Sequence, residues 1–162
     1  MFAVRAPAIR RTAYLLCGDW SHAEDLTQTA FAKLYAAWPR LRDANAAEGY
    51  VRRTLTRTYV DESRRAWRRE RPTDDLPEVV DPNPPQSDDR LLLLAALARV
   101  PPRQRACLVL RFFDDLSVET TATTLGCSIG TVKSNTARGL DALRAALGDA
   151  LPDLILTGRD IS

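Results

Sequence analysis

A proline-rich acidic stretch in the middle of the chain limits how its 162 residues can fold. The segment "PTDDLPEVVDPNPPQSDD", residues 72–89, holds five of the ten prolines and no basic residue. Such a composition interrupts helices and buries too little apolar surface to form a core. A structureless loop of this length is uncommon inside one compact domain. The stretch therefore predicts a flexible acidic linker between two modules, with an ordinary long surface loop as the alternative.

The charged residues divide along the same boundaries. Residues 1–72 carry 14 basic and 8 acidic side chains, a net charge of +6. Residues 73–89 carry 6 acidic side chains and no basic one, a net of −6, and residues 90–162 carry 9 basic and 7 acidic, a net of +2. This pattern predicts a basic module, an acidic tether and a second module.

Apolar residues at helical spacing predict an all-α fold of two small helical domains. Three helices are expected before the linker, at residues 8–16, 21–38 and 50–69, and four between residues 90 and 147. Ser21 and Glu24 have the spacing of a capping box, and Pro39 should end the second helix. The predicted boundaries are 1–71 and 90–149 for the domains, 72–89 for the linker and 150–162 for a C-terminal tail.

The segment "LGCSIGTVKSNTARGLDALR", residues 125–144, combines a chain break with a two-faced helix. Gly126 permits a tight turn between two helices. At about 100° per residue, an apolar stripe opposes a small, basic and hydroxyl-rich face. The stripe contains Val132, Thr136, Leu140, Leu143 and Leu147; the polar face contains Thr131, Ser134 and Arg138, flanked by Lys133 and Asn135. Two interpretations remain open, an ordinary bundle helix or the reading helix of a helix-turn-helix in the DNA major groove.

The sequence has few residues suited to catalysis or metal binding. His22 is the single histidine, and Cys17, Cys107 and Cys127 have no usual zinc-ligand spacing. There is no nucleophile–base pairing and no Gly-rich phosphate loop, so we expect no catalytic residue, metal or cofactor. The scattered thiols suit a reducing cytoplasm. Arginines interrupt the first apolar residues and no run approaches a membrane span, so we expect neither a signal peptide nor membrane insertion.

Two separate stretches resemble the extracytoplasmic-function (ECF) group of bacterial RNA polymerase sigma factors, and their motifs are similar to those of the actinobacterial SigE family. The first is "AYLLCGDWSHAEDLTQTAFAKLYAAW" together with "YVRRTLTRTYVDESRRAWRRERP", which is similar to the sigma-2 domain. The second, "LARVPPRQRACLVLRFFDDLSVETTATTLGCSIGTVKSNTARGLDALR", is similar to the sigma-4 helix-turn-helix domain. The resemblance implies a protein without catalysis of its own, which binds core polymerase, recognises the −35 and −10 promoter elements and promotes DNA opening.

The resemblance also implies partners and site residues. The polymerase partners would be the β′ clamp helices and the β flap, with Glu24, Asp25 and Gln28 on the first of these surfaces. An anti-sigma factor is a further expected partner. The implied −10 contacts are Arg42, Asp43, Asn45 and Ala46 in a loop, followed by Tyr50, Arg53, Arg57, Arg64, Arg65 and Arg68 on the third helix. The implied −35 contacts are Arg111, Val118, Glu119, Thr131, Lys133, Ser134, Asn135 and Arg138.

Some features depart from the family pattern or leave alternatives. Arg57 stands where many relatives have Asn, and Asn135 where many have Arg. The acidic linker either imitates a nucleic-acid backbone inside the polymerase or only keeps the tether extended. Two rival classes remain, a stand-alone helix-turn-helix regulator and an enzyme on a helical scaffold.

Overall fold

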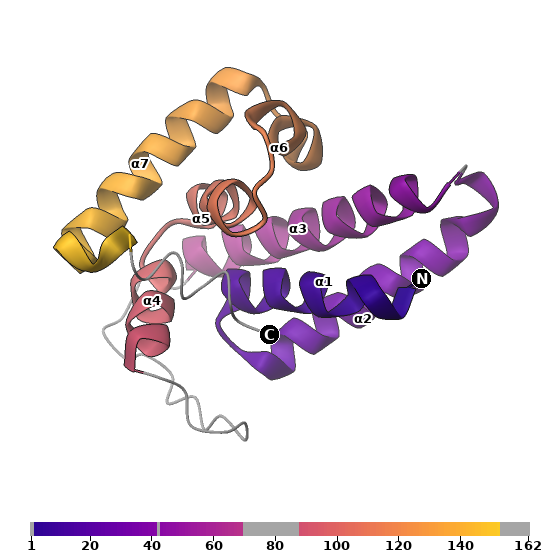
Figure 1. Ribbon diagram of the computed structural model, residues 1–162, viewed down its shortest axis with the longest axis horizontal. Helices are drawn as coiled ribbons and strands as arrows, with labels where there is room; N and C mark the ends of the chain where they lie inside the picture. The colour runs from indigo at the N-terminus through magenta and orange to yellow at the C-terminus, as the bar shows by residue number, and fades with distance from the viewer. Residues whose placement is uncertain (1, 42, 70–87, 153–162) are drawn as a thin grey trace.

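The computed structural model describes residues 2–41, 43–69 and 88–152, without the side chains of 2–5, 44, 45, 67–69 and 150. The described residues form helices and turns and contain no strand, which confirms the all-α prediction. Figure 1 shows α1, α2 and α3 on one side of the molecule and α4, α5, α6 and α7 on the other. The predicted linker, apart from its last two residues, and the C-terminal tail beyond Pro152 lie outside the described residues.

Three helices form the N-terminal half: α1 (Phe2–Cys17), α2 (Trp20–Ala37) and α3 (Ala44–Arg69). The prediction that Ser21 caps the second helix was wrong. Asp19 has the extended backbone of an N-cap, and its carboxylate accepts a 2.9 Å hydrogen bond from the Ser21 backbone N–H. Aspartate and serine are similarly good N-cap residues. Because the helix already begins at Trp20, the N-cap position falls on Asp19 rather than on Ser21.

The end of the second helix agrees with the prediction, whereas the start of the third does not. The α2 helix stops at Ala37, and Pro39 lies in the short 3-10 turn Trp38–Arg40 that follows, where its missing N–H removes no helical bond. The third helix starts at Ala44 instead of residue 50, because the Asp43 carboxylate accepts a 2.8 Å bond from the Ala46 N–H and caps it. Of the residues predicted as a −10 loop, Asp43 therefore forms this cap, and Asn45 and Ala46 lie in the first turn of α3.

Four helices form the C-terminal half: α4 (Asp88–Ala98), α5 (Pro102–Leu108), α6 (Val118–Leu125) and α7 (Ile129–Leu147). A π-helical segment, Val109–Phe113, continues α5. Threonine-rich α6 is a poor helix former. It is stabilised by the Ser117 side chain, which accepts from the Thr120 N–H at its N-terminus, and by burial of Thr121 and Ala122.

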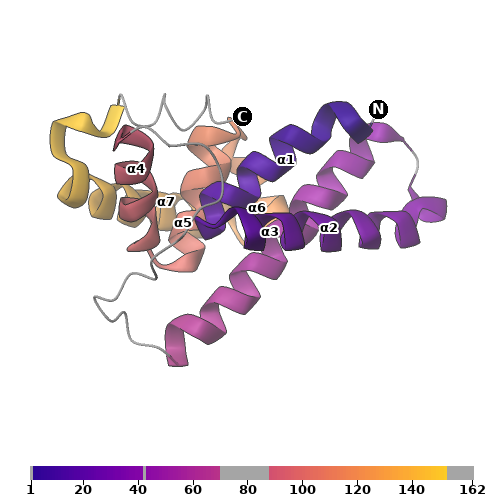
Figure 2. The same ribbon diagram turned by 90° about the horizontal axis from the view of Figure 1, so that it is seen from below.

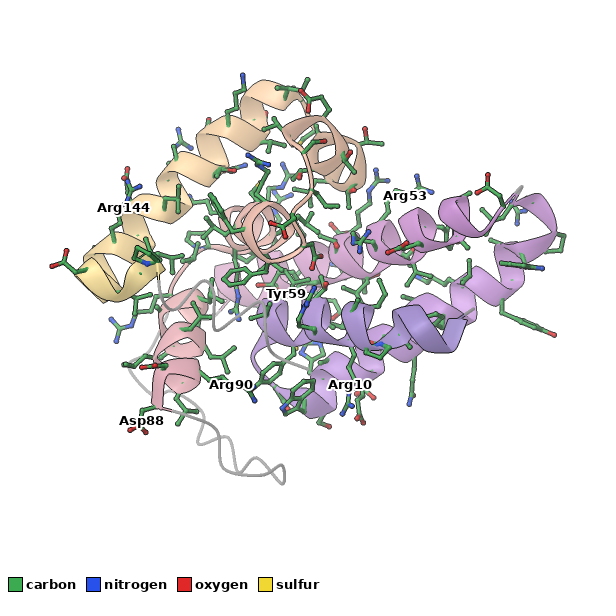
Figure 3. The ribbon with its side chains drawn as sticks, viewed as in Figure 1. Arg10, Arg53, Tyr59, Asp88, Arg90 and Arg144 are labelled. Atoms are coloured by element: carbon green, nitrogen blue, oxygen red, sulfur yellow. The ribbon has the colours of Figure 1, made fainter. Side chains whose placement is uncertain are left out.

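The two halves share one hydrophobic core. Buried residues of α1, α2 and α3 pack in the same cluster as those of α4, α5 and α7, including Leu16, Leu55, Leu97, Leu108 and Leu143. Figure 2 shows α3 as a long diagonal that crosses from α1 and α2 toward α5. Tyr59, on α3, lies at the centre of the molecule and is buried (Figure 3).

Buried polar groups join the halves as well. The Arg105 guanidinium on α5 donates two bonds, of 3.0 and 2.7 Å, to the Leu15 carbonyl near the end of α1. Asp114, after the π-helical segment, accepts from the Thr12 hydroxyl and lies 3.5 Å from guanidinium nitrogens of Arg11 and Arg52. A charged group is tolerated in a core only when it has such partners.

Candidate nucleic-acid interface

The N-terminal half of α7 presents a polar face on a firmly anchored helix. Gly126 ends α6 with a left-handed φ of +69°, which a glycine adopts without strain, and Ser128 caps α7 by accepting from the Thr131 N–H at 3.1 Å. Val132 and Leu143 are fully buried on the opposite side. The predicted division of α7 into an apolar stripe and a polar face is therefore confirmed.

Gly139 explains how closely α7 approaches the helix beneath it. A Cβ atom at this position would lie 2.8 Å from a Leu108 methyl group on α5. Because Gly139 has no side chain, α7 packs closely against α5, and this packing fixes the position of the polar face relative to α5. Lys133, Ser134 and Arg138 are exposed on that face. Their small or flexible side chains, with no carboxylate among them, suit close approach to phosphates and base edges.

The other predicted −35 residues are divided between structural and exposed positions. Arg111 is half-buried, and its guanidinium donates a 2.6 Å bond to the Leu116 carbonyl, which holds the turn before α6. Val118 packs against the small cluster around Cys107 and Val132. Glu119 is exposed in the first turn of α6, and Thr131 is half-buried beside its cap.

Asn135 does not lie on the outer face. It is half-buried and lines a cleft of about 200 Å³ between α3 and the helix-turn-helix, together with Arg57, Asp61, Arg103 and Cys127. The sequence placed Asn135 on a flank of α7 but could not show that α3 covers that flank. The cleft is thus lined by a predicted −10 residue on one wall and a predicted −35 residue on the other.

The predicted −10 residues lie along α3. The Arg53 guanidinium lies 5.6 Å from the Tyr50 ring centroid, and the two side chains form a cation–π pair on α3. Arg57 bonds to α6, Arg64 is half-buried and Arg65 is exposed. Asp43 and Ala46 are exposed at the start of the helix. Arg42 lies outside the described residues, as do the side chains of Asn45 and Arg68.

The predicted polymerase-binding residues share one exposed side of α2. Glu24, Asp25 and Gln28 are all exposed, and Leu26 is buried beneath them. The Glu24 carboxylate forms a 2.6 Å ion pair with Arg10 of α1, whose guanidinium also lies over the Trp20 ring. Glu24 therefore does not complete a capping box; it forms an ion pair between α1 and α2. Asp25 and Gln28 remain exposed beside it.

Sequence reasoning missed two exposed aromatic residues. Tyr35 and Trp38 follow the apolar spacing of the second helix, which is typical of core residues, yet their exposed fractions are 86% and 46%. They lie at the C-terminal end of α2, where the helix extends past α1 (Figure 2). The spacing alone could not distinguish them from core residues, because the apolar periodicity of α2 continues beyond the point where α1 ceases to cover it.

The described residues offer no group of three or more His, Cys, Asp or Glu side chains placed to hold a metal. Burial raises the pKa of Cys17 to about 11 and that of Cys107 to about 12, so both thiols stay protonated near neutral pH. Within those same residues, no helix is both long enough and apolar enough to cross a membrane.

Family profiles match both halves of the chain. Sigma-70 region 2 matches residues 1–69, and Sigma-70 region 4 matches residues 90–143. The RNA polymerase sigma-E factor of Streptomyces coelicolor is 40% identical over 144 residues, covering 88% of this chain and 81% of that protein. The ECF RNA polymerase sigma factor SigE of Mycolicibacterium smegmatis is 38% identical over 149 residues, covering 86% of this chain and 57% of that protein.

A solved structure has the same fold. The sigma factor RpoE of Bartonella quintana, in complex with the anti-sigma factor NepR, superposes with a TM-score of 0.72 at 24% identity, covering 91% of this chain and 94% of that one. The two region matches come in chain order, and the second contains the helix-turn-helix described above. The chain therefore belongs to the sigma-70 family of bacterial RNA polymerase sigma factors, within the ECF group and similar to its sigma-E members.

Proposed function

We propose that this sigma factor reads the −35 element with α7 and holds the −10 element with α3. The observation that carries the proposal is the anchored start of α7, where buried Val132 and Leu143 hold an exposed face of Lys133, Ser134 and Arg138. A helix-turn-helix inserts the start of its second helix into the major groove. Ser134 and Arg138 would contact bases, while Lys133 would neutralise phosphate. The half-buried Asn135 would reach a base only after α3 moves away.

The α3 surface has the composition needed to hold an opened strand. Single-stranded DNA is bound by positive charge along the backbone and by aromatic rings under the bases. Tyr50 and Arg53 form such a pair, and Arg64 and Arg65 extend the positive charge along the helix. Residues 1–71 would form the domain for core polymerase and the −10 element, and residues 90–149 the −35 domain, with 72–89 as the tether.

The exposed residues Glu24, Asp25 and Gln28 would contact the β′ clamp helices, and the C-terminal half would face the β flap. No catalytic residue is proposed, because initiation uses the active site of the polymerase. A protein that works on polymerase and chromosome would act in the cytoplasm. An anti-sigma factor is proposed as a regulator, since the Bartonella quintana structure pairs a sigma factor of the same fold with one.

Run-off transcription with purified core polymerase on a promoter library tests the proposal. We expect transcripts that depend on this chain and start at promoters sharing two elements. Asp25→Lys should abolish the activity by weakening polymerase binding, whereas Asp141→Lys, the same charge change on the exposed outer part of α7, should retain most of it. Absence of transcripts on every template with folded protein would refute the proposal. Tight binding to a palindromic duplex without polymerase would favour a stand-alone regulator instead.

A further inference from the structure

A row of four side chains joins α1 to the first turns of α2. The rings of Tyr14 and Trp20 are stacked, with centroids 3.8 Å apart and planes inclined by 4°. The Arg10 guanidinium lies 4.7 Å from the centroid of the Trp20 ring, and its Nη2 donates a 2.6 Å bond to Oε1 of Glu24. Arg10 lies where α1 and α2 pack side by side (Figure 3). We call these four residues the Arg10 stack.

The stack is fixed from the core outward. Arg10 and Tyr14 are four residues apart on α1, so both side chains lie on one face of that helix. Tyr14 is 2% exposed, and its ring covers one face of the half-buried Trp20 ring. The Arg10 guanidinium therefore lies over the other face. An arginine can stack on a ring and still donate from the edge of its planar group, which is how Arg10 reaches the Glu24 carboxylate.

Glu24 is the exposed end of the stack. The side chains of Arg10 and Glu24 are 45% and 51% exposed. Exposed pairs of long side chains usually contribute little, because both side chains lose rotamer freedom when they meet. Here the Trp20 ring already holds the arginine, so the pair orders mainly the glutamate. The bond uses Oε1, and a carboxylate has two accepting oxygens, so a partner can still donate to Oε2.

We propose that Arg10 is a positioning residue for polymerase binding: it orders the Glu24 carboxylate before the polymerase binds. The inference rests on the proposed contact of Glu24, Asp25 and Gln28 with the polymerase. Ordering a flexible side chain at an interface weakens association. In this chain the ordering is completed within the free protein, so α1 contributes to an interface whose contacting residues lie on α2.

Two simpler roles for Arg10 predict different affinities. If the guanidinium only neutralised Glu24, its removal would leave a further negative charge exposed and strengthen binding to a basic partner surface. If Arg10 only held α1 against α2, its removal would lower the stability of the protein and leave the affinity of the folded chain unchanged. A positioning role predicts weaker binding by a protein that remains folded.

Binding of the full-length chain to immobilised core polymerase, without DNA, distinguishes these roles. We expect Arg10→Ala to bind on the order of three- to tenfold more weakly than the wild-type protein, the range that corresponds to one immobilised side chain. Arg10→Lys should lose less affinity, because it keeps the charge but not the planar group. Trp20→Leu should lose about as much as Arg10→Ala, although it leaves every charge of the chain in place.

A double-mutant cycle tests whether Arg10 acts through Glu24. Glu24→Ala should weaken binding at least as much as Arg10→Ala, and the double variant should bind no more weakly than Glu24→Ala alone. Lys33→Ala is the charge-matched control. Lys33 is exposed on α2 and, at about 100° per residue, lies on the side of the helix opposite Glu24. Its removal should leave the affinity for core polymerase unchanged.

Three results would overturn the positioning role. They are an Arg10→Ala protein that binds as well as or better than the wild type, a double variant with additive losses, and a Lys33→Ala protein that loses as much affinity as Arg10→Ala. Circular dichroism checks folding. If Trp20→Leu is unfolded, the two variants of the exposed Arg10 decide.

Asp25→Lys separates this inference from the proposed function. If Asp25→Lys abolishes binding and Arg10→Ala does not weaken it, the proposed polymerase-binding surface stands and the positioning role is refuted. If Asp25→Lys and Glu24→Ala both bind like the wild type, this side of α2 is not the polymerase-binding surface, and both proposals are refuted.

Discussion

The helices α7 and α3 both carry residues expected to bind DNA, yet these residues contribute differently to the packing of the fold. On α7 the side chains of Lys133, Ser134 and Arg138 are exposed, and the buried residues Val132 and Leu143 anchor the opposite side of the helix. On α3 one arginine, Arg57, caps a helix of the other half. The comparison teaches that an arginine expected to bind DNA can also be a structural contact between the two halves.

The anchor of α7 is tested most severely by Leu143→Ala. Leu143 is 1% exposed and packs in the shared core, so its truncation should lower the free energy of unfolding by about 2–5 kcal/mol. Urea unfolding monitored by circular dichroism measures the loss. Leu92→Ala is the control, because Leu92 is 53% exposed and its truncation should cost far less. Equal losses in both variants would contradict the apolar anchoring of α7.

A second test adds volume between α7 and α5. Gly139→Ala places a methyl group 2.8 Å from Leu108, which should cost about 1–3 kcal/mol of stability despite the better helix propensity of alanine. Gly49→Ala on α3 meets no atom within 4 Å and should be neutral or stabilising by up to about 1 kcal/mol. Thermal unfolding of the pair checks the difference, and a stabilised Gly139→Ala protein would show that α7 is not tightly seated.

The reading face itself is tested by a contrast between the two helices. Arg138→Ala should reduce discrimination among −35 sequences by about 1–3 kcal/mol in holoenzyme binding, because a base contact is lost. Arg65→Ala on α3 should weaken binding to all promoters alike and lower the salt slope by about 1, as loss of a phosphate contact does. Holoenzyme titrations on promoter variants at several salt concentrations measure both effects. A uniform loss for Arg138→Ala would count against base reading.

The smallest expected effect concerns the buried carboxylate between the halves. Burial raises the pKa of Asp114 above its ordinary 3.8, with Arg52, Thr12 and Arg11 opposing the shift. The folded protein therefore holds the Asp114 proton more tightly than the unfolded chain does, and the cost of the buried charge is present above the raised pKa. As pH falls toward 3.8, this cost disappears.

Asp114→Asn isolates the effect from the other carboxylates. The stability of the wild-type protein relative to Asp114→Asn should rise as pH is lowered from 7 toward 4, as measured by urea unfolding at each pH. The opposite trend would mean that the two arginines outweigh burial and that Asp114 is a stabilising ion-paired charge.

Much of the fold could be predicted from patterns among residues close together in the sequence. Helical periodicity, the Gly126 turn and the two-faced character of residues 129–147 depend on neighbours in the chain, and the family resemblance rests on contiguous motifs. Those signals predicted the all-α fold, the helix-turn-helix and its outward face. The capping residue of α2 and the start of α3 were missed, because several residues near each helix start could act as caps.

The chain sequence by itself determined which segments are helical, which face of α7 is apolar and to which family the protein belongs. Only the tertiary structure decided that Tyr35 and Trp38 are exposed, that Arg105 and Asp114 are buried together with their partners, and that Arg57 and Asn135 line one cleft. The physical reason is range: periodicity and capping act over a few residues. The hydrogen-bond partners of Arg57, Arg105 and Asp114 lie 66 to 102 residues away in the chain, and only packing of the two halves brings them together.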